Sequence, residues 1–162
     1  MKPLTAIALL AVLAPASRAQ APQAAPVGME RDLIAAVLIA EAGGEGRRGL
    51  AAVYEVIWMR AVERKRSLTA VVLQRRQFSC LNRRSPAVVV AAGRVHARWR
   101  WVRDELLKHP PLTMYTVPAH LLELNVNRAN HYHAARLNPR PAWARGQVPR
   151  RVGRHLFYRL TK

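Results

Sequence analysis

The sequence is poor in cysteine, in acidic residues and in aromatic residues. Its single cysteine, Cys80, excludes an internal disulfide framework and a metal cluster built from several cysteines. Only nine acidic residues stand against 27 lysines and arginines, which gives a formal net charge of +18. Such an excess of positive charge favours a polyanionic partner: nucleic acid, anionic lipid or the acidic polymers of a bacterial envelope.

Apolar side chains, by contrast, are plentiful. Hydrophobic residues make up 51% of the sequence, which is enough to fill a core and excludes a disordered basic tail. A chain of 162 residues fits one compact domain.

The first nineteen residues have the layout of a secretory signal peptide. Lys2 gives a positive start, residues 4–13 form an almost wholly apolar run, and Pro15 precedes small residues that offer a cleavage site after Ala19. The run is about half of the roughly 20 apolar residues that a membrane-spanning helix needs, so an uncleaved anchor is the weaker alternative. Cleavage removes Lys2 and Arg18 and no acidic residue, so the charge falls from +18 to +16.

The expected export of the protein favours some of these polyanionic partners over others. An exported protein meets peptidoglycan and anionic lipid, so we expect secretion to the periplasm or cell envelope, peptidoglycan as partner, and no nucleic acid. The sequence has no nucleic-acid-binding motif that would argue otherwise. Residues 20–28 are rich in Pro and Ala and predict a flexible linker, which leaves residues 29–162 as a single, monomeric domain. We expect its charge to hold it on the anionic envelope, an attraction that salt weakens.

Hydrophobic periodicity predicts a mainly α domain with a small β-element (α+β). Four helices are expected, over residues 30–42, 47–62, 68–73 and 86–106. Pro118 is expected to open a further helical turn. Residues 131–134 and 155–158 are strand-like and are expected to close across a loop rich in Pro, Arg and Trp.

Glu41 is the most informative single residue. Its offsets from Ile34 and Val37, seven and four residues, place its carboxyl group on the apolar stripe of the 30–42 helix. It also lies in the last turn, where the helix dipole disfavours negative charge. Both effects favour the protonated form of a carboxyl group, and a glycosidase uses a protonated acid on the leaving-group oxygen. The alternative is a glutamate that reaches solvent or pairs with an arginine.

Several short motifs follow one another in a fixed order along the chain. They are Glu-Ala-Gly-Gly-Glu at 41–45, an apolar helix ending in Arg at 49–60, Gln-Phe-Ser-Cys at 77–80, Asn-His-Tyr-His at 130–133 and Gly-Arg-His-Leu-Phe-Tyr at 153–158. The ordered set resembles the SleB/CwlJ family of cell wall hydrolases. The resemblance implies a lysozyme-like, lytic-transglycosylase-like fold and cleavage of the MurNAc–GlcNAc bond of peptidoglycan, with Glu41 as the catalytic acid.

The other candidate site residues lie in the same motifs. Glu45 is the only other acid near Glu41 and is the candidate for a second carboxylate. The residues expected to bind the glycan are Gln77, Phe78, Ser79, Tyr132, His133 and Tyr158. The alternative for the first three is ordinary loop packing, and for the aromatic residues it is the core.

One well-placed acid favours a single-carboxylate route, which gives a lytic transglycosylase with 1,6-anhydro products and no cofactor. If the products carry reducing ends instead, the enzyme is a hydrolase and Glu45 becomes the candidate base.

Three histidines are compatible with a different class of enzyme. His131 and His133 share one face of a strand and His155 offers a third ligand, as a zinc-dependent N-acetylmuramoyl-L-alanine amidase requires. Because these histidines match segments of the resembled family, we expect no metal. Cys80 as a thiol nucleophile and a non-enzymatic cationic envelope-binding protein are the remaining alternatives.

Overall fold

The structure is a computed structural model, and it describes residues 28–108 and 128–161. The expected signal peptide, the linker up to residue 27 and the helical turn at Pro118 lie outside the described residues.

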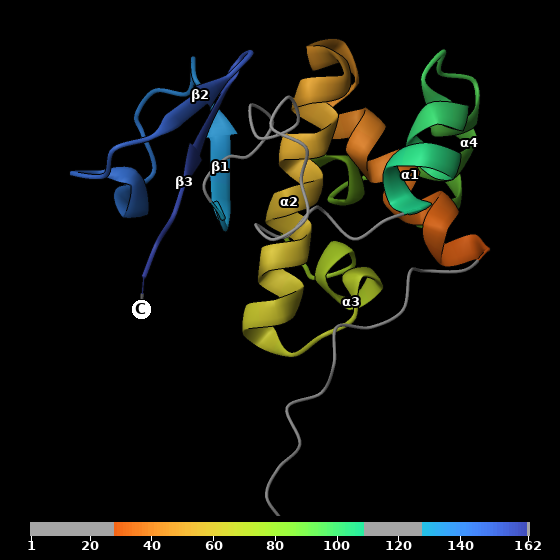
Figure 1. Cartoon of the computed structure of the whole chain (residues 1–162), viewed down its shortest axis with the longest axis horizontal. Helices are drawn as coiled ribbons and strands as arrows, with labels where there is room; N and C mark the ends of the chain where they lie inside the picture. The colour runs from red at the N-terminus through yellow and green to blue at the C-terminus, as the bar shows by residue number, and fades with distance from the viewer. Residues whose placement is uncertain (1–27, 109–127, 162) are drawn as a thin grey trace, which may run out of the picture.

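Helix α1 (Met29–Ala42) is the central element of the fold (Figure 1). Every residue from Asp32 to Ile39 is buried, so all sides of these two turns face protein. Its neighbours are α2 (Gly46–Arg64), α3 (Leu68–Val72) and α4 (Pro86–Arg94). The sequence predicted a helix with one apolar face, but neighbours on several sides bury the whole middle of this helix.

Local signals set the ends of the helices. Ser67 caps α3 by accepting a hydrogen bond from the Ala70 N–H at 3.0 Å, and Ser85 caps α4 in the same way. Gly43 ends α1 by starting a short 3₁₀ turn, η1 (Gly43–Glu45). The predicted helices at 30–42, 47–62 and 68–73 are confirmed, each with ends within two residues of the prediction.

The long helix expected over residues 86–106 is wrong in its middle. α4 ends at Arg94, and the chain turns before a π-helical segment, η3 (Trp101–Glu105), and a 3₁₀ turn, η4 (Leu106–Lys108). At the end of α4 the Gly93 backbone lies so close to α1 that a Cβ at this position would be 2.9 Å from the Ala36 Cα. The next turn is closed locally, because the His96 Nδ1 accepts the Arg98 N–H at 3.1 Å. A close helix–helix contact and a local hydrogen bond thus lie at the break, and hydrophobic periodicity predicts neither of them.

The β-element is a three-stranded antiparallel sheet with the order β1-β3-β2. Its strands are β1 (His131–Ala134), β2 (Arg150–Val152) and β3 (His155–Tyr158). The pairing of β1 with β3 was predicted and is confirmed; β2 was missed. The sheet packs beside α2, at the opposite side of that helix from α4 in Figure 1. The mainly α domain with a small sheet is thus confirmed.

Within the described part of the chain, no helix combines the length and the apolar character needed to cross a membrane.

Asp32 fastens α1 to the segments that follow it. Its carboxylate accepts hydrogen bonds from Arg94 at 2.7 Å and from Arg103 at 2.5 Å, although it is 8% exposed. Burial alone would raise the pKa of Asp32, but the hydrogen bonds and charges of Arg94 and Arg103 hold that pKa below its usual range.

Replacing Asp32 by asparagine is expected to weaken the acid dependence of stability. Because the folded-state pKa is lowered, the stabilisation from Asp32 is present above the ordinary aspartate pKa of about 4 and is lost as the pH falls below it. Asp32→Asn should cost about 2 kcal/mol at pH 7 and lose less further stability than wild type between pH 5 and pH 3. Urea unfolding at these pH values measures both effects. Glu30→Gln, at an exposed carboxyl on the same helix, is the control; a pH profile of Asp32→Asn that parallels wild type would contradict the assignment.

Candidate active site

Glu41, a half-buried residue at the end of α1, connects this helix by hydrogen bonds to two other segments of the chain. Glu41 Oε1 accepts a hydrogen bond from the Ser79 hydroxyl at 3.0 Å and from the Cys80 N–H at 3.4 Å. Its Oε2 accepts one from the Tyr132 hydroxyl at 3.1 Å. Ser79 and Cys80 belong to the 3₁₀ turn η2 (Ser79–Leu81), and Tyr132 belongs to β1. The structure therefore brings together Glu41 and two of the residues expected to bind glycan.

The partners of Glu41 suit a carboxyl group that changes its protonation state. A hydroxyl both donates and accepts hydrogen bonds, so Ser79 and Tyr132 can pair with either a carboxylate or a carboxylic acid. The Cys80 N–H only donates, and it approaches Oε1 at the longer distance of 3.4 Å. No rearrangement of the backbone is needed when a proton arrives at or leaves this carboxyl.

Tyr132 is held in place by its neighbours on β3. Its ring stacks on Phe157 at 5.5 Å between centroids and meets the His155 ring edge-on at the same distance. Burial raises the pKa of Tyr132 well above its usual range, and the Glu41 charge adds to the effect. The phenol stays protonated and remains a donor to Glu41.

Glu45, the candidate second carboxylate, is already engaged. Its side chain is 4% exposed, its Oε2 accepts the Arg154 N–H at 2.7 Å, and its Oε1 accepts the Arg154 Nε at 2.8 Å. Burial alone would raise the pKa of Glu45, but the Arg154 hydrogen bonds and the charges of His155 and Arg154 lower it overall. Gly153 allows the contact: it has φ +54°, and a Cβ there would lie 1.8 Å from Glu45 Oε2. Glu45 thus ties η1 to the β2–β3 hairpin.

The three histidines make separate contacts. The His133 Nδ1 faces the Ala134 carbonyl oxygen at 2.8 Å, so it carries the proton, and Nε2 accepts the Tyr158 hydroxyl at 2.9 Å. His131 faces the Asn130 side chain at 3.0 Å. Burial lowers the pKa of His155, although the neighbouring carboxylate of Glu45 opposes the shift. Across residues 28–108 and 128–161, no group of three or more His, Cys, Asp or Glu side chains is arranged to hold a metal ion.

Three residues expected to bind glycan lie in the interior instead. Phe78 is 1% exposed and belongs to the main core. Tyr158 is also 1% exposed, and His133, stacked on it at 5.3 Å, is 7% exposed. Both pack on the face of the sheet that carries Trp143, where a second, small core forms. These side chains support the loop and strand that carry Ser79 and Tyr132, and little of their surface is exposed.

Gln77 and Ser79 are more accessible: Ser79 is exposed and Gln77 is half-buried. The Gln77 N–H donates to the Gln74 carbonyl oxygen at 3.1 Å, which shapes the loop before η2.

Cys80 lies beside Glu41, but its thiol is not activated. Burial raises the pKa of Cys80 to about 11, and the Glu41 carboxylate contributes in the same direction. Cys80→Ser is therefore expected to keep kcat on purified peptidoglycan within about twofold of wild type. Ser79→Ala, one residue away, removes a donor to Glu41 and is expected to lower kcat about tenfold. A dye-release assay on both variants checks the pair, and loss of activity in Cys80→Ser alone would restore the thiol hypothesis.

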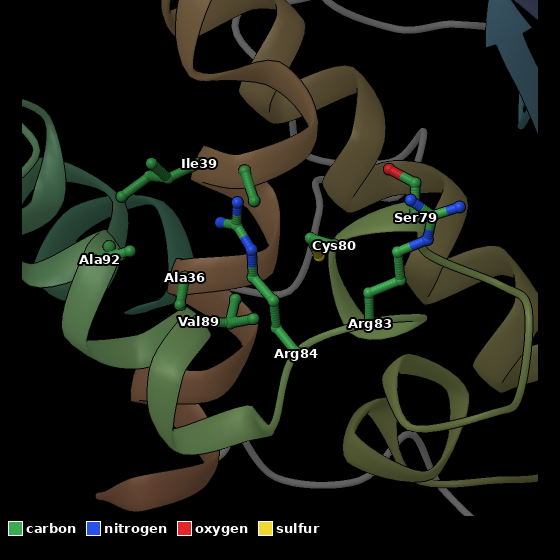
Figure 2. Close-up of a pocket in the computed structure, with 10 residues that line it drawn as sticks. Ala36, Ile39, Ser79, Cys80, Arg83, Arg84, Val89 and Ala92 are labelled. Atoms are coloured by element: carbon green, nitrogen blue, oxygen red, sulfur yellow. The ribbon is translucent and has the colours of Figure 1, made fainter.

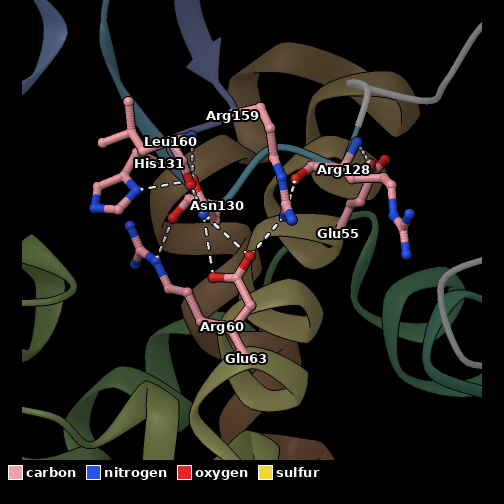
Figure 3. Close-up of polar contacts among 8 residues, drawn as sticks. All are labelled: Glu55, Arg60, Glu63, Arg128, Asn130, His131, Arg159 and Leu160. Carbon is pink, nitrogen blue, oxygen red and sulfur yellow. Dashed lines mark hydrogen bonds and ion pairs between the residues drawn. The ribbon is translucent and has the colours of Figure 1, made fainter. Parts of the chain in front are cut away.

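A polar network around the buried Arg60 and Asn130, two motif residues to which no role was assigned, anchors β1 to α2 (Figure 3). The Arg60 Nε donates to the Asn130 carbonyl oxygen at 2.7 Å, and the Asn130 Nδ2 donates to Glu63 at 3.1 Å. Arg159 donates to the same carboxylate at 2.6 Å. Burial lowers the pKa of Arg60 to about 10. The network fixes the start of β1 and so the position of Tyr132. A charged residue amid the apolar residues of α2 was the signal that could have revealed it.

A pocket of about 480 Å³ opens beside Glu41, between α1, η2 and α4 (Figure 2). Ile39 and Val89 supply apolar walls, whereas Ser79, Arg83 and Arg84 supply polar ones. Because Ser79 both lines the pocket and donates to Glu41, the pocket and the carboxylate share a wall.

Comparison with known proteins identifies the class. A family model described as Cell Wall Hydrolase matches residues 44–158, more than half of the chain. The chain belongs to this family of cell wall hydrolases, the SleB/CwlJ type that the motifs indicated, and peptidoglycan is its substrate class. No curated protein and no solved structure matches it, so the lysozyme-like fold stays a prediction. The match includes Ser79 and Tyr132 and begins three residues after Glu41.

Proposed function

We propose that this cell wall hydrolase cleaves the MurNAc–GlcNAc bond as a lytic transglycosylase, with Glu41 as its only catalytic carboxyl group. One observation carries the proposal: Glu41 is held by two hydroxyl groups beside an open pocket, while Glu45, the other carboxylate of the same motif, is bound by Arg154. A glycosidase that uses two carboxyl groups needs the second one free to act on water or on the sugar.

The reaction proceeds in two proton transfers through one residue. Protonated Glu41 gives its proton to the glycosidic oxygen as the bond from that oxygen to C1 of MurNAc breaks. The resulting Glu41 carboxylate then takes the proton of the MurNAc 6-hydroxyl, whose oxygen bonds to C1. The 1,6-anhydro product leaves, and Glu41 is again protonated. Ser79 and Tyr132 hold the Glu41 carboxyl group through their hydroxyl groups in both states.

Mass spectrometry of digested peptidoglycan tests this assignment. We expect every new chain end to carry 1,6-anhydro-MurNAc, which is one water lighter than a reducing end. New reducing ends would show hydrolysis of the same bond, and release of stem peptides from intact glycan would show an amidase. Either result would overturn the transglycosylase proposal.

We also propose that the chain is exported to the envelope by its first nineteen residues and is held there by its positive charge. The described residues carry exposed arginines in several turns and loops, such as Arg66, Arg83 and Arg145. Attraction of this kind is screened over about 10 Å at 0.1 M salt. Binding to sacculi should therefore fall between 50 and 500 mM NaCl.

A further inference from the structure

We propose that the pocket beside Glu41 is a subsite for a carboxylate-bearing substituent of the glycan, bound by Arg83 and Arg84. The inference rests on the proposed function, because it takes the substituent from the same polymer that Glu41 cuts. It adds a specificity determinant that neither the motifs nor the family match assigns.

The two arginines are available to a ligand. Both are exposed and line the pocket, and neither has a carboxylate partner among the residues that the structure describes. The described acids Asp32, Glu45 and Glu63 already pair with other arginines. In the view of Figure 2, Arg84 extends toward Ile39 and α1, and Arg83 extends on the side of the pocket that carries Ser79. Guanidinium groups bind carboxylates through paired N–H donors, so this arrangement favours an organic anion.

The rest of the pocket fits a short aliphatic group. Ile39 and Val89 form apolar walls, and the methyl groups of Ala36 and Ala92 line the space between α1 and α4. A ligand for this pocket therefore combines a carboxylate with a methyl-sized apolar portion. Two parts of peptidoglycan have that chemistry: the lactyl group on C3 of MurNAc, when its carboxyl is free, and the stem peptide, which carries alanine methyl groups and free carboxylates.

The position of the pocket agrees with either source. Ser79 lines the pocket and donates to Glu41, and the Cys80 N–H does the same from the next residue. The C3 substituent and the reacting C1 belong to one sugar ring. A MurNAc unit whose C1 lies at Glu41 therefore carries its substituent on the same ring as the bond that is cut, and Ser79 places the pocket next to Glu41.

Binding measured without catalysis tests the subsite. In a Glu41→Gln background, Arg83→Gln with Arg84→Gln is compared with Arg66→Gln with Arg75→Gln, which removes two exposed arginines that do not line the pocket. NMR titration uses three soluble GlcNAc–MurNAc fragments: with stem peptide, with a free lactyl carboxylate, and with that carboxylate converted to a neutral methylamide.

We expect the Arg83/Arg84 variant to bind at least one charged fragment about tenfold more weakly, with the control pair within twofold of its parent and the neutral fragment unaffected. Loss confined to the peptide-bearing fragment assigns the stem peptide, and loss on the free lactyl form assigns the lactyl carboxylate. Equal binding by both double variants overturns the subsite.

The same pairs in the wild-type background separate this inference from the proposed function. The subsite predicts a raised KM on sacculi with a nearly unchanged kcat. If wild type cuts glycan and the two pairs behave alike, the subsite is wrong while the function stands. If wild type releases no glycan fragments at all, the proposed function itself has failed.

Discussion

Glu41→Gln is expected to abolish the release of glycan fragments from purified sacculi, with kcat reduced about 10³-fold or more. A glutamine has the shape of the glutamate and keeps an oxygen that accepts a hydrogen bond, so contacts with Ser79 or Tyr132 can persist. It cannot give a proton to the glycosidic oxygen or take one from the 6-hydroxyl, and general acid–base groups contribute factors of this order. Chromatography of released fragments measures the loss.

Two controls separate chemistry from folding in this experiment. The melting temperature of Glu41→Gln should stay within a few degrees of wild type, because the side chain is only half-buried at the end of α1. Glu30→Gln makes the same change at an exposed carboxyl at the start of that helix and should keep full activity. Substantial cutting by Glu41→Gln would remove Glu41 from the mechanism.

Some of the helix ends that could be predicted from the sequence are marked locally. α3 and α4 begin after serine caps, and α1 ends at Gly43, so local signals set these three ends. The break after α4 was not predictable in this way. It lies next to the contact of Gly93 with Ala36, two residues that are far apart in the sequence. β2 was missed because Arg150–Val152 is too short to show an alternating pattern.

The site was predictable as a set of motifs, but the orientation of their side chains was not. Tyr132 and His133 are neighbours in β1 and therefore point to opposite faces of the sheet. Tyr132 faces Glu41, whereas His133 faces Tyr158 and the small second core. Alternation separates the two faces, but only the packing of the sheet on α2 decides which face reaches Glu41. Tertiary contacts likewise bury Phe78 in the core and direct the Ser79 hydroxyl to Glu41.

Glu45→Gln is expected to lower the free energy of unfolding by about 2 kcal/mol while kcat stays within a fewfold of wild type. The Glu45 carboxylate is 4% exposed and accepts two hydrogen bonds from Arg154, and losing hydrogen bonds to a buried charge costs this order of energy. Arg154 is 74% exposed, so the ion pair itself adds little. Urea unfolding at pH 7 gives the stability change, and kcat is measured well below the melting temperature of the variant.

The pH dependence of stability tests the role of Glu45 independently. Because the pKa of Glu45 is lowered in the folded state, its stabilisation is present above the ordinary glutamate pKa and is lost as the pH falls below that value. Glu45→Gln should therefore lose less further stability than wild type on acidification to pH 3. Arg154→Gln is the matched partner variant, and it should also lose stability and keep kcat.

Variants of the two carboxyl groups are thus expected to have opposite effects on activity and stability. Glu41→Gln removes activity and spares stability, whereas Glu45→Gln removes stability and spares activity. If Glu45→Gln instead lowered kcat a hundredfold with unfolding unchanged, Glu45 would be the base of a hydrolytic mechanism. Such an enzyme would have to release Glu45 from Arg154 when substrate binds, and its products would carry reducing ends in place of the 1,6-anhydro sugar.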